Sequence, residues 1–179
     1  SAFIVRARKE GLRDFGACMS PTSAFHILQG IETLGMRMQR HVENTRAIVG
    51  FLQQQETVEA VGYPELDGHP DQALAAKLLP RGCGAVFSFN LSGGRDAGVA
   101  FVDALDLFSH LANVGDAKSL VIHPASTTHH RMDDAALAAG GISNGTIRLS
   151  IGLEDPSDLI ADLKQGLRAA AKVSAGAKA

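Results

Sequence analysis

The chain is poor in aromatic residues and has no long apolar run. Aromatic residues make up 5% of its 179 residues and tryptophan is absent, so it lacks the rings that stack on single-stranded nucleic acids. Its net charge of −2 also disfavours binding to a phosphate backbone. No apolar stretch approaches the ~18 residues that span a membrane, and we find no signal peptide. We therefore expect no nucleic-acid partner, no membrane partner and a cytoplasmic location.

Several types of reactive site are also missing from the sequence. The two cysteines, Cys18 and Cys83, lie far apart, and we expect free buried thiols, with a disulfide as the alternative. Seven histidines are present, but neither HxH nor HExxH spacing occurs, so we expect no metal site. A GxSxG nucleophile motif is absent as well. His123, which precedes Pro124, is expected to shape a loop rather than transfer protons.

What the chain does contain is an ordinary globular composition with mixed helical and strand patterns. Hydrophobic residues make up 45% and charged residues 20% of the sequence, which fits about one domain. Ser20 before Pro21 and Asp155 before Pro156 each predict a helix start. Three or four amphipathic strands accompany several helices, and their order is not βαβ. We therefore expect an α+β fold, with helices packed on one face of a mostly antiparallel sheet.

One predicted strand, residues 146–153, carries a single charge. Apolar and polar residues alternate strictly along it, which is typical of a half-buried strand. Arg148 lies on the polar side among small neighbours, with no acidic residue beside it on that side. It is either an exposed arginine on the outer face of a sheet or an anchor for a carboxylate, which a guanidinium binds through two parallel hydrogen bonds. The pattern alone leaves both interpretations open.

Four stretches resemble the Cys/Met-metabolism family of pyridoxal-phosphate (PLP) enzymes. They are GLRDFGACMSPTSAFHILQGIETLGMRMQRHVENT, the Tyr63-Pro64 turn, NVGDAKSLVIHPASTTH and TIRLSIGLEDPSDLIADLKQGL, in order over roughly residues 5–172. The third is most similar to O-acetylhomoserine sulfhydrylases, which make homocysteine from O-acetylhomoserine and sulfide. The resemblance implies the small C-terminal domain of a fold-type-I PLP enzyme. Methionine γ-lyase and O-succinylhomoserine sulfhydrylase remain alternatives, as does a non-catalytic assembly domain.

The resemblance implies a role for three residues in binding an amino-acid substrate. Arg148 matches the arginine that grips the substrate α-carboxylate in the family. Asn113 and Thr128 match positions near the same pocket, where each would donate a hydrogen bond. From the residues alone, Asn113 is equally a turn residue and Thr128 an ordinary loop hydroxyl.

The sequence also departs from the family, because none of its lysines lies in the Ser-x-Thr-Lys-type segment that forms the Schiff base with PLP. The aspartate partner and phosphate loop of the cofactor are missing too. We therefore expect PLP in the full-length enzyme and none bound to this chain, which would be inactive alone. The expected layout is a segment from a missing large domain over 1–19, a substrate-orienting domain over 20–173 and a frayed tail over 174–179. The parent enzyme is expected to be a homo-oligomer, as the family tetramer implies.

Overall fold

The computed structural model describes residues 2–176, which fall into two compact units divided between Met36 and Arg37. Residues 20–36, which we expected to be part of the C-terminal domain, belong to the first unit. Residues 177–179 of the expected tail lie outside the described part of the chain. Within that part, no helix is both long and apolar enough to cross a membrane.

The first unit is helical. Its elements are α1 (Ala2–Arg6), the π-helical segment η1 (Ala7–Asp14) and α2 (Pro21–Glu32). The predicted helix start is confirmed, because the Ser20 hydroxyl accepts a hydrogen bond from the backbone N–H of Ser23 at 3.1 Å. None of the residues of these helices is buried, so the apolar face of α2, with Phe25 and Leu28, is exposed.

The second unit is built on a five-stranded sheet with the strand order β1-β2-β5-β4-β3. The strands are β1 (Val58–Gly62), β2 (Val86–Leu91), β3 (Ser109–His110), β4 (Leu120–Ile122) and β5 (Thr146–Ser150). All pairs are antiparallel except β3 with β4. The mostly antiparallel sheet that the sequence predicts is therefore confirmed, with β5 as its middle strand.

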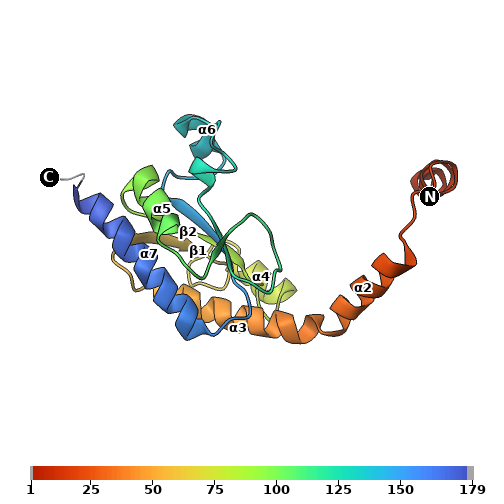
Figure 1. Cartoon of the computed structure of the whole chain (residues 1–179), viewed down its shortest axis with the longest axis horizontal. Helices are drawn as coiled ribbons and strands as arrows, with labels where there is room; N and C mark the ends of the chain where they lie inside the picture. The colour runs from red at the N-terminus through yellow and green to blue at the C-terminus, as the bar shows by residue number, and fades with distance from the viewer. Residues whose placement is uncertain (1, 177–179) are drawn as a thin grey trace. The chain divides into compact units, whose positions relative to one another are not determined.

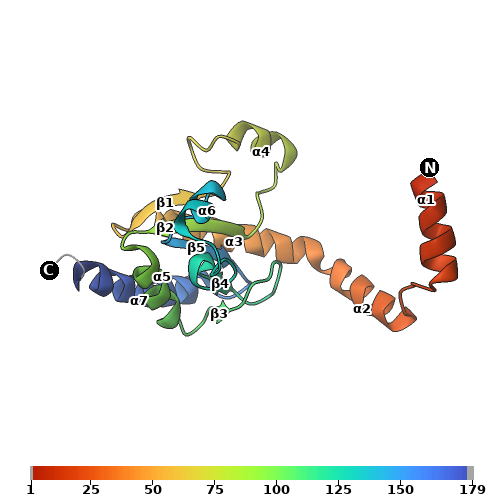
Figure 2. The same ribbon diagram turned by 90° about the horizontal axis from the view of Figure 1, so that it is seen from above.

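Among residues 34–176, six helical segments accompany the sheet. They are α3 (Leu34–Leu52), α4 (Gln72–Leu78), α5 (Gly94–Asp103), the 3₁₀ turn η2 (Pro124–Ser126), α6 (Asp134–Ala139) and α7 (Pro156–Gly176). The residues of α3 from Arg37 onward belong to this unit. Helices α5 and α7 lie side by side (Figure 1). Helix α4 stands at the end of a long excursion between β1 and β2 (Figure 2).

The hydrophobic core lies between one face of the sheet and three helices. Phe87 and Phe89 of β2 stand opposite Leu149 and Ile147 of β5, and all four are buried. They pack with residues of α3, α5 and α7 in one cluster. The expected placement of helices on one face of the sheet is therefore confirmed, and the other face carries Arg148.

Helix α7 packs closely on α5 because position 166 has no side chain. A Cβ atom at Gly166 would lie 2.8 Å from the ring of Phe101, which is closer than such contacts allow. The helix begins as predicted, since Asp155 accepts a hydrogen bond from the backbone N–H of Ser157 at 2.8 Å. It continues through Gly176, and the Ser174 hydroxyl donates to the Ser92 carbonyl at 3.1 Å. Residues 174–176 of the expected tail are thus helical.

Strand β5 is shorter than the alternation of residues predicts. It ends at Ser150 rather than at residue 153. The reason is that the backbone N–H of Gly152 donates to the Ser119 hydroxyl at 2.8 Å, and that of Leu153 donates to the Ala117 carbonyl at 2.9 Å, so the chain leaves the sheet. Both faces of β5 are largely covered, and Arg148 is its one half-buried residue.

Candidate functional site

Arg148 occupies the middle of the central strand, on the face of the sheet opposite the core. In register it stands between Ser88 of β2 and Ile122 of β4. Because strands on both sides fix its backbone, the base of the side chain is held rigidly. No carboxylate between residues 2 and 176 forms an ion pair with it. A half-buried guanidinium without a charge partner is suited to binding an anion.

The hydrogen-bond partner of Arg148 is a backbone group of the loop between β3 and β4. Its Nη2 donates to the carbonyl oxygen of Asn113 at 3.4 Å, which is a long hydrogen bond. The side-chain oxygen of Asn113 instead accepts from the backbone N–H of Val114 at 2.9 Å, within its own turn. The structure therefore brings Asn113 to Arg148, but through the main chain.

Thr128 is exposed and lies in the loop that follows η2. Its hydroxyl is 2.8 Å from Nδ1 of His129. Within the described residues, no hydrogen bond joins Thr128 to Arg148 or Asn113. Its predicted place near the substrate therefore stays a prediction.

Polar side chains surround Arg148 on its face of the sheet. Thr146 donates through its hydroxyl to the side-chain oxygen of Asn90 at 2.7 Å, so these two groups satisfy each other. Ser150 is 3% exposed, and its hydroxyl has no partner among residues 2–176. Among residues 2–176, this face therefore carries one cation without an ion-pair partner and one hydroxyl without a hydrogen-bond partner, two residues apart on the same strand.

The space beside Arg148 is shallow. The hollow has no room for a water molecule, and its walls are Leu111, Asn113, Leu120, Ile122, Leu149 and Ser150. Within the second unit, this hollow is therefore too small to enclose a ligand.

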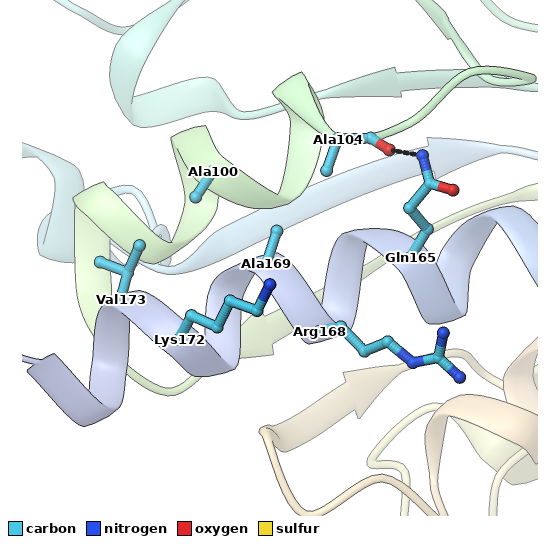
Figure 3. Close-up of a pocket in the computed structure, with 7 residues that line it drawn as sticks. All are labelled: Ala100, Ala104, Gln165, Arg168, Ala169, Lys172 and Val173. Carbon is cyan, nitrogen blue, oxygen red and sulfur yellow. Dashed lines mark hydrogen bonds between the residues drawn. The ribbon is translucent and has the colours of Figure 1, made fainter.

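A larger hollow lies on the helix side of the sheet, between α5 and α7 (Figure 3). Its volume is about 510 Å³, and its walls are Ala100, Ala104, Gln165, Arg168, Ala169, Lys172 and Val173. The Gln165 amide is already used, because it donates to the Ala104 carbonyl at 2.6 Å. The walls are mainly small apolar side chains and carry no convergent set of polar groups, so this hollow is a weaker site candidate than Arg148.

His123 shapes the loop after β4, as its sequence context predicts. Its Nε2 donates to the Asn144 carbonyl at 2.8 Å, which leaves Nδ1 to accept from the Ser126 hydroxyl at 2.8 Å. The ring is 1% exposed. Burial lowers the pKa of His123 below its ordinary value of 6.5, and the positive charge of Arg95 acts in the same direction. The imidazole is therefore neutral at pH 7 and structural.

The depressed pKa of His123 predicts a loss of stability in acid. Below pH 6.5 the unfolded chain binds a proton at this position and the folded chain does not, so the free energy of unfolding falls as the pH drops from 6.5 toward the lowered pKa. Chemical denaturation at a series of pH values measures this slope. His123→Gln should flatten it, whereas His26→Gln, at an exposed histidine, should leave it unchanged. An equal slope in H123Q and the unmodified chain would exclude His123 as the cause.

A second polar cluster surrounds Cys83. The carboxylate of Glu65 accepts from Nε of Arg46 at 2.6 Å and from the backbone N–H of Cys83 at 2.8 Å. Burial raises the pKa of the Cys83 thiol, and the nearby Glu65 carboxylate raises it further. A thiol in this setting is a poor nucleophile, which agrees with a structural role.

Both cysteines are free, but the expectation of buried thiols is wrong, because Cys18 is exposed and Cys83 is only half-buried. Within residues 2–176, no group of three or more histidine, cysteine or acidic side chains is placed to hold a metal ion.

The contacts around Glu154 are not predictable from the sequence. Its carboxylate accepts two hydrogen bonds from Ser119, at 2.7 and 2.9 Å. The two residues are 35 positions apart and lie in different turns, so no local spacing links them.

Comparison with known proteins identifies the family to which this chain is similar. The model of the family described as Cys/Met metabolism PLP-dependent enzymes matches residues 4–168. The O-acetyl-L-homoserine sulfhydrylase of Leptospira meyeri is 46% identical over 168 residues, which cover 93% of this chain and 38% of the relative. The L-methionine gamma-lyase of Pseudomonas putida is 44% identical over 171 residues, covering 95% and 43%.

Solved structures agree with this match. The structure of an O-acetylhomoserine (thiol)-lyase from Campylobacter jejuni, which carries a pyridoxyl-lysine phosphate group, is similar with a TM-score of 0.84 and 39% identity. The similarity covers 93% of this chain and 40% of that one. The chain thus spans about two fifths of the length of the proteins it matches. The match to the family model over nearly its whole length shows that the chain belongs to the Cys/Met metabolism family of PLP-dependent enzymes.

Proposed function

We propose that this chain is the C-terminal part of an O-acetylhomoserine sulfhydrylase and that it orients the substrate. In the reaction, the sulfur of sulfide replaces the acetoxy group on the γ-carbon of O-acetylhomoserine, and the products are homocysteine and acetate. The observation that carries the proposal is the half-buried guanidinium of Arg148 on the non-core face of the central strand, which has no ion-pair partner among residues 2–176. It would bind the α-carboxylate through two parallel hydrogen bonds.

The cofactor of the family does not fit the described residues of this chain. A lysine that forms a Schiff base lies in a desolvated pocket, whereas every lysine among residues 2–176 is exposed. None of them lines the hollow at Arg148. We therefore place PLP, which supplies the electron sink for this chemistry, on polypeptide outside the chain.

The role of the chain would be to hold the substrate in one orientation. A carboxylate fixed by a rigid strand limits how the γ-carbon presents itself to the cofactor, and such positioning accelerates a reaction without direct chemistry. Asn113 and Thr128 stay as candidate hydrogen-bond donors of the same pocket. By itself the chain would be inactive, and we place the parent protein in the cytoplasm as a homo-oligomer.

A second candidate activity within the same class is methionine γ-lyase. It is favoured by the Pseudomonas putida relative, whose identity of 44% lies close to that of the sulfhydrylases. An α-carboxylate is common to both substrates, so Arg148 does not distinguish the activities. O-Succinylhomoserine sulfhydrylase is a further alternative for the same reason.

Product analysis on the complete protein separates these activities. With O-acetylhomoserine and sulfide, the proposal predicts homocysteine and acetate. With methionine alone it predicts no methanethiol above background. Methanethiol release from methionine without homocysteine formation would overturn the sulfhydrylase assignment, and preference for the succinyl ester would overturn the choice of acyl group.

A non-catalytic assembly domain that is independent of its parent enzyme is disfavoured by the surface of the first unit. Such a domain would bury its own apolar residues. Instead, large apolar side chains are exposed there, including Phe3, Phe15, Phe25, Leu28 and Ile31. Exposed apolar residues at this density are typical of a surface that another polypeptide covers.

A further inference from the structure

The loop between β3 and β4 forms a strap beside Arg148, which we define as residues 111–118. Nearly all of its residues are exposed, and the large apolar side chains of Leu111 and Val114 are 51% and 58% exposed. The strap therefore has little packing of its own to hold it. Its carbonyl at Asn113 is nevertheless the group that accepts the hydrogen bond from Arg148.

The carboxylate of Glu154 fixes the C-terminal end of this strap. One of its oxygens accepts from the backbone N–H of Ser119 at 2.7 Å, and the other accepts from the Ser119 hydroxyl at 2.9 Å. The Ser119 hydroxyl in turn accepts from the backbone N–H of Gly152 at 2.8 Å. Hydrogen bonds to an ionised carboxylate are stronger than those between neutral groups. Ser119 itself is fully buried.

The turn that carries Glu154 is anchored to helix α3. The side-chain amide of Asn44 donates to the carbonyls of Gly152 and Glu154, at 3.0 and 2.8 Å. Asn44 is buried, so these hydrogen bonds are shielded from water. Position 152 also requires glycine, because a Cβ atom there would collide with the backbone at Ala117. The strap is thus attached, through Glu154, to a rigid support.

We propose that Glu154 is a positioning residue for the carboxylate site of Arg148. It holds the strap so that the Asn113 carbonyl sets the plane of the guanidinium, leaving the remaining N–H groups free for the substrate. The proposal rests on the proposed role of Arg148. A guanidinium that turns freely would bind a carboxylate less well, because two parallel hydrogen bonds require one orientation of the fork.

Kinetics of the complete protein test this role. Glu154→Ala should raise KM for O-acetylhomoserine about tenfold, which corresponds to losing one charge-assisted hydrogen bond between Arg148 and the substrate carboxylate. The values of kcat and of KM for sulfide should change less than about twofold. Glu154→Gln keeps an oxygen that accepts from Ser119 and should recover most of this loss. Ser119→Ala, which removes one of the two donors, should raise KM about threefold and serves if E154A does not fold.

A matched control is Glu65→Gln. Glu65 likewise accepts a hydrogen bond from a loop N–H, that of Cys83, but it does not touch the strap. This variant should lower the melting temperature and leave KM unchanged. A rise in KM equal to that in E154A would mean that any loosened loop produces the effect, and the positioning role would be wrong.

A double-mutant cycle separates this inference from the proposed function. If Glu154 acts through Arg148, then E154A should cause no further rise in KM when Arg148 is already replaced by alanine. An equal rise in both backgrounds would overturn the positioning role alone. Failure of Arg148→Ala to raise KM would overturn the proposed function itself, whatever Glu154 does.

Discussion

Arg148→Ala in the complete protein should raise KM for O-acetylhomoserine roughly a hundredfold. The variant removes two charge-assisted hydrogen bonds to the substrate carboxylate, worth about 3 kcal/mol together, and 1.4 kcal/mol corresponds to a factor of ten. The cost in structure is small, because among the described residues the Arg148 side chain makes one long hydrogen bond, to the Asn113 carbonyl. Steady-state kinetics with varied O-acetylhomoserine at saturating sulfide measure the effect.

Sulfide provides an internal control for this experiment, because it has no carboxylate and its KM should not change. Arg148→Lys keeps the charge but loses the planar fork, so KM should rise only about tenfold. If KM for O-acetylhomoserine stayed within about twofold of the unmodified protein in R148A, the side chain would not bind the substrate.

Phe101→Ala should destabilise this chain by about 3–5 kcal/mol, a large part of the 5–15 kcal/mol that usually stabilises a domain. The ring is fully buried and meets Phe89 edge to face at 5.6 Å. It also fills the space above Gly166 of α7, so its loss opens a cavity between α5, α7 and the sheet. Denaturation monitored by circular dichroism gives the free energy of unfolding.

The matched control is Phe25→Ala, which removes a ring of the same size from an exposed position on α2. Its effect should stay within about 0.5 kcal/mol. Destabilisation by Phe25→Ala equal to that by Phe101→Ala would mean that the ring of Phe25 is packed. A loss below about 1 kcal/mol in Phe101→Ala would mean that the second unit does not depend on the cluster around Phe101.

Local signals in the sequence predicted the elements whose causes are local. Ser20 with Pro21 and Asp155 with Pro156 locate two helix starts, because the capping group lies within three residues of the N–H groups it binds. Alternation of apolar and polar residues located β5, since neighbouring side chains of a strand point to opposite faces. These features need no knowledge of the rest of the fold.

Features that depend on distant residues were not predictable in this way. Alternation extended β5 to residue 153, but contacts with Ala117 and Ser119 end it at Ser150. The alternation also indicates an open polar face, whereas Thr146 and Ser150 are buried.

The candidate site likewise combines a feature that a local pattern predicts with features that depend on distant residues. The strand pattern identified Arg148 as a charge on the non-core face, and the structure confirms this placement. The pattern did not choose between an outer-surface arginine and a carboxylate anchor. That choice came from the family resemblance, together with the absence of an ion-pair partner among the described residues. The contact through the carbonyl of Asn113, rather than its amide, required the path of the strap.

The most direct test of the account is a crystal structure of the complete protein with an amino-acid substrate or product bound. The account predicts that the two α-carboxylate oxygens lie about 2.7–2.9 Å from two nitrogens of the Arg148 guanidinium. A bound ligand whose carboxylate is held by another cationic group, with Arg148 still directed only at the Asn113 carbonyl, would contradict it.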